Sequence, residues 1–124
     1  MARDGTLAYA SRMDWTKKHC VPCEGGVPRI DRARAAELIG TLRGWELQGE
    51  RLHRAFKFAD FAAAMRFVNA LAALAESEGH HPDFALHDWN RLDVTTWTHA
   101  IGGLSENDFI LAGKIDALPG AAPG

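Results

Sequence analysis

The strongest helix signal in the chain is the stretch Asp60-Phe-Ala-Ala-Ala-Met-Arg-Phe-Val-Asn-Ala-Leu-Ala-Ala-Leu-Ala-Glu-Ser-Glu-Gly79. Asp60 has the short polar side chain of an N-cap, and Gly79 suits the position after a helix end. Apolar residues recur between them with the period of an amphipathic helix. They are Phe61, Ala64, Met65, Val68, Leu71, Ala72 and Ala75. We therefore predict one long helix with an apolar face.

Patterns of strand type lie on both sides of this helix. Upstream, residues 51–58 alternate, with Leu52, Arg54, Phe56 and Phe58 on one face and His53, Ala55 and Lys57 on the other. Together with residues 45–47 and a glycine-containing turn at 48–50, they predict a β-hairpin. Downstream, residues 85–89 and 92–99 predict a second strand pair, because the latter run is rich in valine, threonine and tryptophan. The turn of this pair is expected at Asn90-Arg91.

Two further helices complete the pattern. Asp31 is a suitable N-cap for residues 31–42, in which Ala35, Leu38, Ile39 and Leu42 recur at helical spacing. Ser105-Glu-Asn-Asp108 has the form of a capping box and leads a helix through Phe109, Ala112, Ile115 and Leu118. The order is helix, hairpin, long helix, strand pair, helix. It predicts an α+β fold, a four-stranded antiparallel sheet with helices packed on one face.

Length and composition indicate one globular domain. The chain has 124 residues, 47% of them hydrophobic and 24% charged, with a formal net charge of -2. There is no basic excess for nucleic acid, no apolar run for a membrane and no secretory signal, so we expect a cytoplasmic protein. Residues 1–30 are expected to form a loosely structured extension, 31–118 the folded domain and 119–124 a flexible tail.

Four of the six histidines fall between positions 80 and 99. Glu76 precedes His80-His81-Pro82 by one helical turn, at the predicted end of the long helix. A carboxylate near an imidazole, and the negative end of a helix dipole, both favour the protonated ring. Histidines poised near working pH are suited to moving protons. Pro82 restricts the backbone of His81 to extended conformations.

Each of these residues also has a purely structural interpretation. Asp108 could only close its capping box, His99 could be an edge residue, and Trp89 and Trp97 could be core or rim aromatics. A zinc site is a sharper alternative, but adjacent histidines rarely bind one ion and no His-x-x-x-His spacing supports them. Upstream, His19 and the Cys20-x-x-Cys23 motif offer three of the four ligands of a structural zinc site. A plain loop with two thiols is the simpler interpretation.

The joint spacing of these residues is more specific than any one of them. The pattern Glu76-x3-His80-His81-Pro82-x6-Trp89-x9-His99-x8-Asp108 resembles the signature of the pterin-4a-carbinolamine dehydratases. The stretches Gly44-Trp45-Glu46, Phe56-Lys-Phe-Ala-Asp-Phe61 and Gly103-Leu-Ser-Glu-Asn-Asp-Phe109 are also similar to that family. The resemblance covers residues 32–117 and shows no departure at the motif positions.

The resemblance implies a hydro-lyase that removes water from a 4a-hydroxytetrahydropterin and yields a quinonoid dihydropterin. It implies catalytic roles for His80, His81 and His99, with Glu76 and Asp108 supporting the rings. Pterin contacts are expected from Trp45, Trp89 and Pro82. Neither a cofactor nor a metal is implied.

The same resemblance implies a homodimer or homotetramer acting in tetrahydrobiopterin recycling, beside a pterin-dependent aromatic amino-acid hydroxylase. Two alternatives stay open. The fold also resembles non-catalytic assembly factors for ribulose bisphosphate carboxylase and dimerisation cofactors of transcription factors. The third class is a small zinc-binding protein.

Overall fold

The computed structural model describes residues 14–22 and 27–121. Along the chain the elements are η1 (Trp15–Lys17), α2 (Arg32–Leu38), η2 (Ile39–Thr41), β1 (Glu46–Gln48), β2 (Arg51–Lys57), α3 (Phe61–Glu78), β3 (Asp83–His87), β4 (Arg91–Thr96), η3 (His99–Ile101) and α4 (Glu106–Asp116). Cys23, most of the predicted extension and the end of the predicted tail lie outside the described residues. No helix within the described ranges has the length and apolar character to cross a bilayer.

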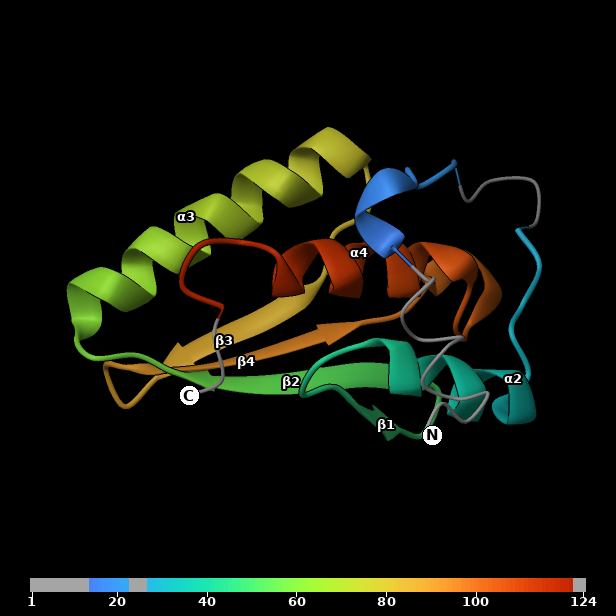
Figure 1. The fold of residues 1–124 in the computed structure, drawn as a ribbon, viewed down its shortest axis with the longest axis horizontal. Helices are drawn as coiled ribbons and strands as arrows, with labels where there is room; N and C mark the ends of the chain where they lie inside the picture. Colours follow the sequence, from blue (N-terminus) through green and yellow to red (C-terminus); the bar gives the residue numbers. More distant parts are fainter. Residues whose placement is uncertain (1–13, 23–26, 122–124) are drawn as a thin grey trace, which may run out of the picture.

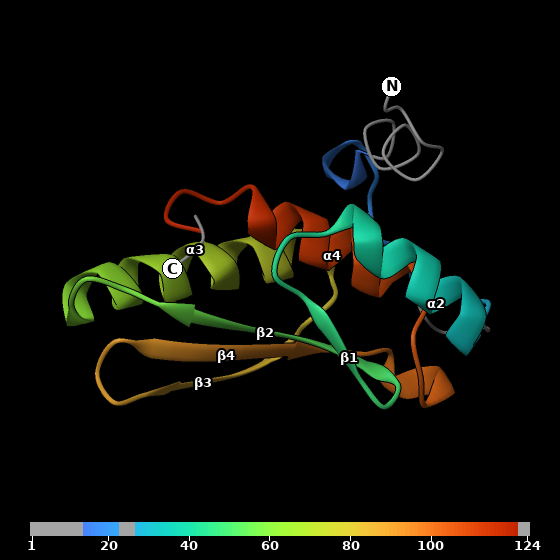
Figure 2. The same ribbon diagram turned by 60° about the horizontal axis from the view of Figure 1, so that its bottom comes forward.

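The four strands form one antiparallel sheet in the order β1-β2-β4-β3. Both hairpins therefore contribute, and the central pair joins β2 of the first hairpin to β4 of the second. The helices α2, α3 and α4 lie on one side of this sheet, as Figure 1 and Figure 2 show. The predicted α+β fold, with a four-stranded antiparallel sheet covered on one face, is confirmed.

The core lies between the sheet and the helices. On β2 the burial alternates as predicted, with Leu52, Arg54 and Phe56 buried and their neighbours more exposed. Leu92 and Val94 of β4 continue the same face and are fully buried. Successive side chains of a strand point to opposite faces of the sheet, so every second residue lies under the helices. The observed burial therefore follows the predicted alternation.

The buried face of α3 differs in part from the predicted one. Ala64, Leu71 and Ala75 are buried as expected, but Phe67 is also 2% exposed whereas Phe61 is 52% exposed. Phe67 packs against Phe56, with ring centroids 4.8 Å apart. Because so much of this helix is alanine, its apolar stripe is wide, and the packing partner on β2 decides which part of the stripe is buried.

The predicted helix ends are confirmed by their hydrogen bonds. The side chain of Asp60 accepts a bond from the N–H of Ala63, and Gly79 adopts the left-handed conformation with φ of 64°. Ser105 and Asp108 form the full capping box at the start of α4. The first helix begins at its predicted cap, Asp31, but its regular α-helical part is shorter than expected and continues as the 3-10 turn η2.

The second hairpin turns earlier than predicted. Its turn comprises residues 88–90 rather than Asn90-Arg91, and β3 starts two residues before the predicted strand. Asn90 is 6% exposed and exchanges hydrogen bonds with Phe58, its amide nitrogen lying 2.8 Å from the Phe58 carbonyl oxygen. Asn90 therefore extends the ladder between β2 and β4. Beyond Thr96 the chain leaves the sheet, so His99 starts η3 instead of ending a strand.

Residues 14–22 pack against the domain, in contrast to the loose extension expected there. Trp15 is 3% exposed; its ring lies against Phe109 of α4, and its indole N–H donates to the Thr41 hydroxyl at 2.7 Å. At the other end, Ala121 is 4% exposed and its carbonyl accepts a bond from Arg54. Each segment is attached to the domain by single residues, such as Trp15 and Ala121, and not by a repeating apolar face. Their sequences therefore show no helical or strand periodicity.

Candidate active site

Three of the predicted histidines meet in one hollow of about 190 Å³, lined by Gly79, His80, His81, Trp97, His99 and Ala100. The hollow lies where α3 ends and where the chain emerges from β4 into η3. The sheet and the long helix thus bring His99 together with His80 and His81, which lie 19 and 18 positions before it in the sequence. The predicted grouping of His80, His81 and His99 agrees with this placement.

His80 is the buried member of the group. Gly79 turns the chain at the end of α3, and the N–H of His80 donates back to the carbonyl of Ala75. The ring is thereby directed inward, where His80 is only 6% exposed. Its Nε2 lies 2.7 Å from Oδ1 of Asp108. The helix end and a carboxylate from α4 together set the position of this ring.

Asp108 combines the two roles that the sequence left as alternatives. It closes the capping box of α4 and also holds the site, and it is completely buried. Its two oxygens accept hydrogen bonds from the hydroxyls of Thr96 at 2.7 Å and Thr98 at 2.8 Å and from the N–H of Ser105 at 3.0 Å. Because a carboxylate oxygen is an acceptor, its contact with His80 places a hydrogen on Nε2 of that ring.

His81 is the exposed member. Its Nε2 lies 2.7 Å from Oε2 of Glu76, and the two side chains are 61% and 78% exposed. The predicted carboxylate partner is therefore present, one turn back on α3. Pro82 follows directly and leads the backbone into β3.

His99 is paired with an aromatic ring rather than with a carboxylate. The ring centroids of His99 and Trp97 are 4.0 Å apart, and the Arg51 guanidinium lies 4.2 Å from the centroid of the Trp97 ring. The indole nitrogen of Trp97 is 3.4 Å from a carboxylate oxygen of Asp83. Trp97 is thus the aromatic wall of the hollow.

The two tryptophans expected to contact a pterin lie elsewhere. Trp45 is buried in the core, where its indole N–H donates to Asp116 at 2.8 Å. Trp89 is 59% exposed on the turn between β3 and β4, with φ of 54°. Neither of them lines the histidine hollow. Sequence reasoning noted Trp97 only as a core or rim aromatic, although its position two residues before His99 was the signal that could have identified it.

The remaining histidines bind carboxylates on other surfaces. On the uncovered face of the sheet, Asp93 accepts from His53 at 3.0 Å and His87 at 2.7 Å. The hydrogen bonds that His87 donates to Asp88 and then to Asp93 raise the pKa of its ring. His19 lies 3.2 Å from Glu78. Only the three histidines of the hollow are grouped around one space within the described part of the chain.

Comparison with known proteins agrees with this arrangement. Residues 28–118 match the family model described as pterin 4 alpha carbinolamine dehydratase. The chain belongs to the pterin-4a-carbinolamine dehydratase family. The matched range includes every residue that lines the hollow. It also includes Asp108, which is hydrogen-bonded to His80.

Relatives of this family are similar over most of the chain. Pterin-4-alpha-carbinolamine dehydratase 2, mitochondrial, from Arabidopsis thaliana is 42% identical over 119 residues, which are 92% of this chain and 64% of that protein. A protein of Stenotrophomonas maltophilia, named provisionally as a pterin-4-alpha-carbinolamine dehydratase, is 49% identical over 106 residues, 84% of this chain and 90% of its own.

Among solved structures, a transcriptional coactivator/pterin dehydratase from Brucella melitensis aligns with a TM-score of 0.68 and 37% identity, covering 73% of this chain and 97% of that one. A pterin dehydratase-like protein identified as a RuBisCO assembly factor in the alpha-carboxysome aligns with a TM-score of 0.54 and 29% identity, covering 66% and 94%. The family fold therefore occurs in proteins with different stated roles.

Cys20 is the one cysteine of its motif that lies within the described residues. Burial, followed by the charge of Glu78, raises the pKa of the Cys20 thiol to about 12. Its sulfur lies 3.5 Å from the carbonyl oxygen of Asn107. Across residues 14–22 and 27–121, no three His, Cys, Asp or Glu side chains are grouped as metal ligands would be.

Proposed function

We propose that this protein is a hydro-lyase that dehydrates 4a-hydroxytetrahydropterin to quinonoid dihydropterin. In this reaction the C4a–O bond breaks, the hydroxyl takes up a proton and leaves as water, and N5 loses its proton. One group must donate a proton and another must accept one. The observation that supports this assignment is the hollow with three imidazoles, in a chain of the dehydratase family.

In the proposed mechanism His81 and His99 flank the reacting C4a and N5 atoms, and His80 assists. In this mechanism His80 donates from Nε2 to Asp108. Asp108 acts as a positioning residue that fixes the orientation of that ring. Glu76 does the same for His81 from the surface.

Trp97 supplies the wall on which a flat pterin ring would stack. Aromatic rings pair favourably in offset or tilted arrangements at centroid distances of about 4.5 to 7 Å. Because Trp97 is already adjacent to His99, a pterin that packs on the indole would lie beside the imidazole. This assigns to Trp97 the contact first expected from Trp45 and Trp89.

The test is dehydration of the carbinolamine, generated in place by a pterin-dependent hydroxylase, with and without the purified protein. We expect His81→Ala and His99→Ala each to lower the rate about 100-fold, in the range of general acid–base contributions. His87→Ala is the matched control, because its ring lies on the uncovered sheet face, and it should retain full activity. Full activity of the double variant His80→Ala/His81→Ala would contradict the assignment.

A non-catalytic role in assembly or dimerisation is the second candidate. It is favoured by the structural similarity to the RuBisCO assembly factor. A protein with that role alone would have no need for three imidazoles around one hollow. No turnover above the uncatalysed rate in the same assay would favour this second role.

The cellular setting belongs to the same proposal. We place the reaction in the cytoplasm, where it would return the pterin to the tetrahydrobiopterin recycling pathway of an aromatic amino-acid hydroxylase. The family supports a pterin substrate for this setting. Loss of hydroxylase-dependent growth in a strain lacking this protein, restored by the wild-type chain but not by His99→Ala, would test it.

A further inference from the structure

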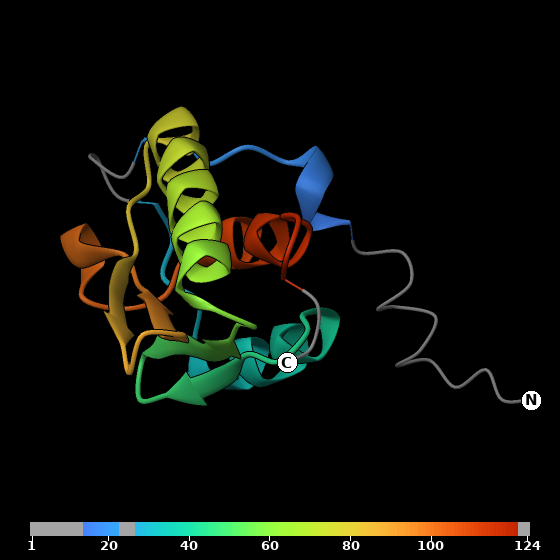
Figure 3. The same ribbon diagram turned by 90° about the vertical axis from the view of Figure 1, so that its left-hand side faces the viewer.

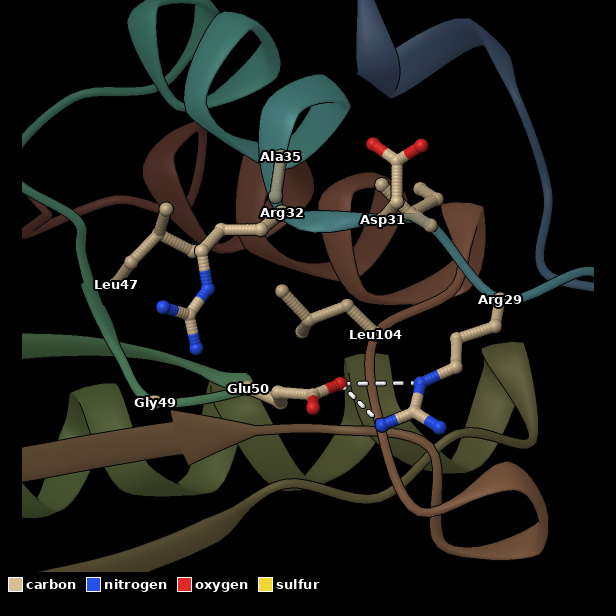
Figure 4. A pocket seen from close by; sticks show the side chains of 9 residues that line it. Arg29, Asp31, Arg32, Ala35, Leu47, Gly49, Glu50 and Leu104 are labelled. Atoms are coloured by element: carbon tan, nitrogen blue, oxygen red, sulfur yellow. Dashed lines mark hydrogen bonds and ion pairs between the residues drawn. The ribbon is translucent and has the colours of Figure 1, made fainter.

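A second and larger hollow, of about 380 Å³, lies between the start of α2, the β1–β2 turn and the loop before α4 (Figure 4). It shares no lining residue with the histidine hollow. Its volume falls within the range of roughly 300 to 1,000 Å³ that is usual for small-molecule sites. Nothing in the proposed dehydration uses it.

The floor of this hollow is apolar. Ile30, Ala35, Leu47 and Leu104 line it. Ala35 and Leu104 are each 2% exposed, because they also belong to the main core. Ile30 and Leu47 are partly exposed, so a ligand with a flat apolar body would remove their surface from water, which stabilises binding.

Three of the charged groups at the hollow already have hydrogen-bond partners. Glu50 accepts from Arg29, whose Nε lies 3.0 Å from Oε1, and Arg29 also reaches the carbonyl of Gly102 at 3.2 Å. Asp31 serves as the N-cap of α2, accepting from the N–H of Arg34 at 2.8 Å, and its carboxylate points away from the hollow in Figure 4. These groups leave no negative charge facing the apolar floor without a partner.

Arg32 is different. Its side chain extends from α2 into the hollow, toward Leu47 and the β1–β2 turn (Figure 4). No hydrogen bond or ion pair joins its guanidinium to any other residue in the described part of the chain. The hollow therefore combines an apolar floor with the guanidinium of Arg32, which has no carboxylate partner among the residues that the structure describes. The planar guanidinium can donate two parallel hydrogen bonds to one carboxylate.

We propose that this hollow binds a small organic monocarboxylate with a flat apolar body. The carboxylate would pair with the Arg32 guanidinium through two parallel N–H···O bonds, and the body would lie on Leu47 and Leu104. We expect a ligand with a single negative charge, because Arg29 is paired with Glu50 and, among the described residues that line the hollow, only Arg32 remains to pair with the ligand. The site stands independently of the proposed dehydratase activity.

The test uses phenylacetate as the probe, titrated into the full-length ¹⁵N-labelled protein and followed by amide chemical shifts. We expect saturable shifts at Leu47, Gly49 and Leu104. Acetate lacks the apolar body and benzyl alcohol lacks the charge, so each should bind at least about tenfold more weakly than phenylacetate.

Arg32→Gln should weaken phenylacetate binding by about tenfold or more, the effect of losing a charged hydrogen-bonding pair. Arg34→Gln is the matched control, because Arg34 is on the same helix and pairs with Glu37 instead; it should bind like the wild type. Unchanged binding by Arg32→Gln, or shifts centred on the histidine hollow, would overturn the proposal. Equal binding of benzyl alcohol would overturn it as well.

Discussion

Trp97 contacts the Arg51 guanidinium and the His99 imidazole at the same time, so its ring restricts one of the three histidines of the hollow. A cation beside an aromatic face contributes about 0.5 to 2 kcal/mol. The indole is thereby held in place, and the imidazole that leans on it is held too. In the proposed mechanism Trp97 is therefore a positioning residue as well as a wall of the hollow.

We predict that Trp97→Ala lowers kcat for carbinolamine dehydration by about tenfold, since a misplaced catalytic group costs of this order or more. Trp97→Phe should recover most of kcat, because a smaller ring can still pack on His99. Steady-state kinetics of both variants provides the measurement. Trp89→Ala, on the exposed turn, is the control and should be unaffected. Equal loss in the Ala and Phe variants would show that the aromatic contact is not the cause.

Glu78 is the residue whose charge state links the segment 14–22 to the domain. Burial alone would raise the pKa of this carboxylate, but hydrogen bonds from Lys114, the N–H of Cys20 and His19 lower it to about 2, against an ordinary value of 4.5. Since the folded pKa lies below the unfolded one, the carboxylate stabilises the fold above pH 4.5. This stabilisation is lost as the pH falls from there toward 2.

We therefore predict that Glu78→Gln lowers the free energy of unfolding at neutral pH and that its difference from the wild type shrinks as the solution is acidified below pH 4.5. Urea unfolding at a series of pH values measures this. Glu37→Gln removes a surface ion pair instead, with Glu37 66% exposed, and should change little at any pH. A pH-independent deficit for Glu78→Gln would mean that shape rather than charge is responsible.

At the scale of elements, η1 and α4 approach each other closely at one glycine. A Cβ placed on Gly113 of α4 would lie 2.4 Å from the Cβ of Trp15, far inside contact distance. The absence of a side chain at position 113 is what allows Trp15 to pack on the helix. This contact, with the bond from Trp15 to Thr41, attaches the 3-10 turn.

We predict that Gly113→Ala destabilises the protein by about 1 to 3 kcal/mol, as overpacking does, although alanine normally favours a helix over glycine. Gly40→Ala is the matched control, because a Cβ there meets nothing within 4 Å. Thermal unfolding should show a lower Tm only for the first variant. A raised Tm for Gly113→Ala would refute the close packing of Trp15.

The elements themselves were largely predictable because their signals are local. N-caps at Asp31, Asp60 and Ser105 act on N–H groups two or three residues away, so the sequence contains both partners. The turn of the second hairpin was misplaced because Asn90 is held by Phe58, which is 32 positions distant. A sequence pattern over a few residues cannot predict a hydrogen bond to a partner so far along the chain.

At the scale of the whole molecule, the outer side of α3 stays uncovered. It lies above the sheet on the outside of the helical layer, as Figure 3 shows end-on. Phe61 is 52% exposed on this helix, and Ala62, Ala72 and Ala73 are exposed further along it. Exposed apolar side chains can be buried at a contact between copies, and the homo-oligomer that the family resemblance implies would need such a contact.

We predict that the protein is a homodimer or homotetramer that uses this face and that Ala72→Glu shifts it toward the monomer. Burying an unpaired carboxylate at a contact between copies is costly. Sedimentation equilibrium at several concentrations measures the mass. Ala36→Glu, on the exposed side of α2, is the control and should leave the mass unchanged. A monomeric wild type at high concentration would contradict the prediction.

The sequence by itself determined the fold class, the caps and the set of chemically suitable side chains. Strand alternation, helix period and capping depend on residues only a few positions apart. Asp108 is an instructive limit. Its capping role was readable from Ser105, three residues away, whereas its bond to His80 spans 28 positions.

Only the tertiary structure decided which tryptophan lines the histidine hollow, which part of the alanine-rich stripe of α3 is buried, and that Trp15 attaches the segment 14–22. The second hollow, which Arg32 lines, also became apparent only in the tertiary structure. Each of these depends on the register between β2 and β4 or on how α3 and α4 pack over the sheet. Such contacts join residues far apart in sequence, and their geometry exists only once the chain has folded.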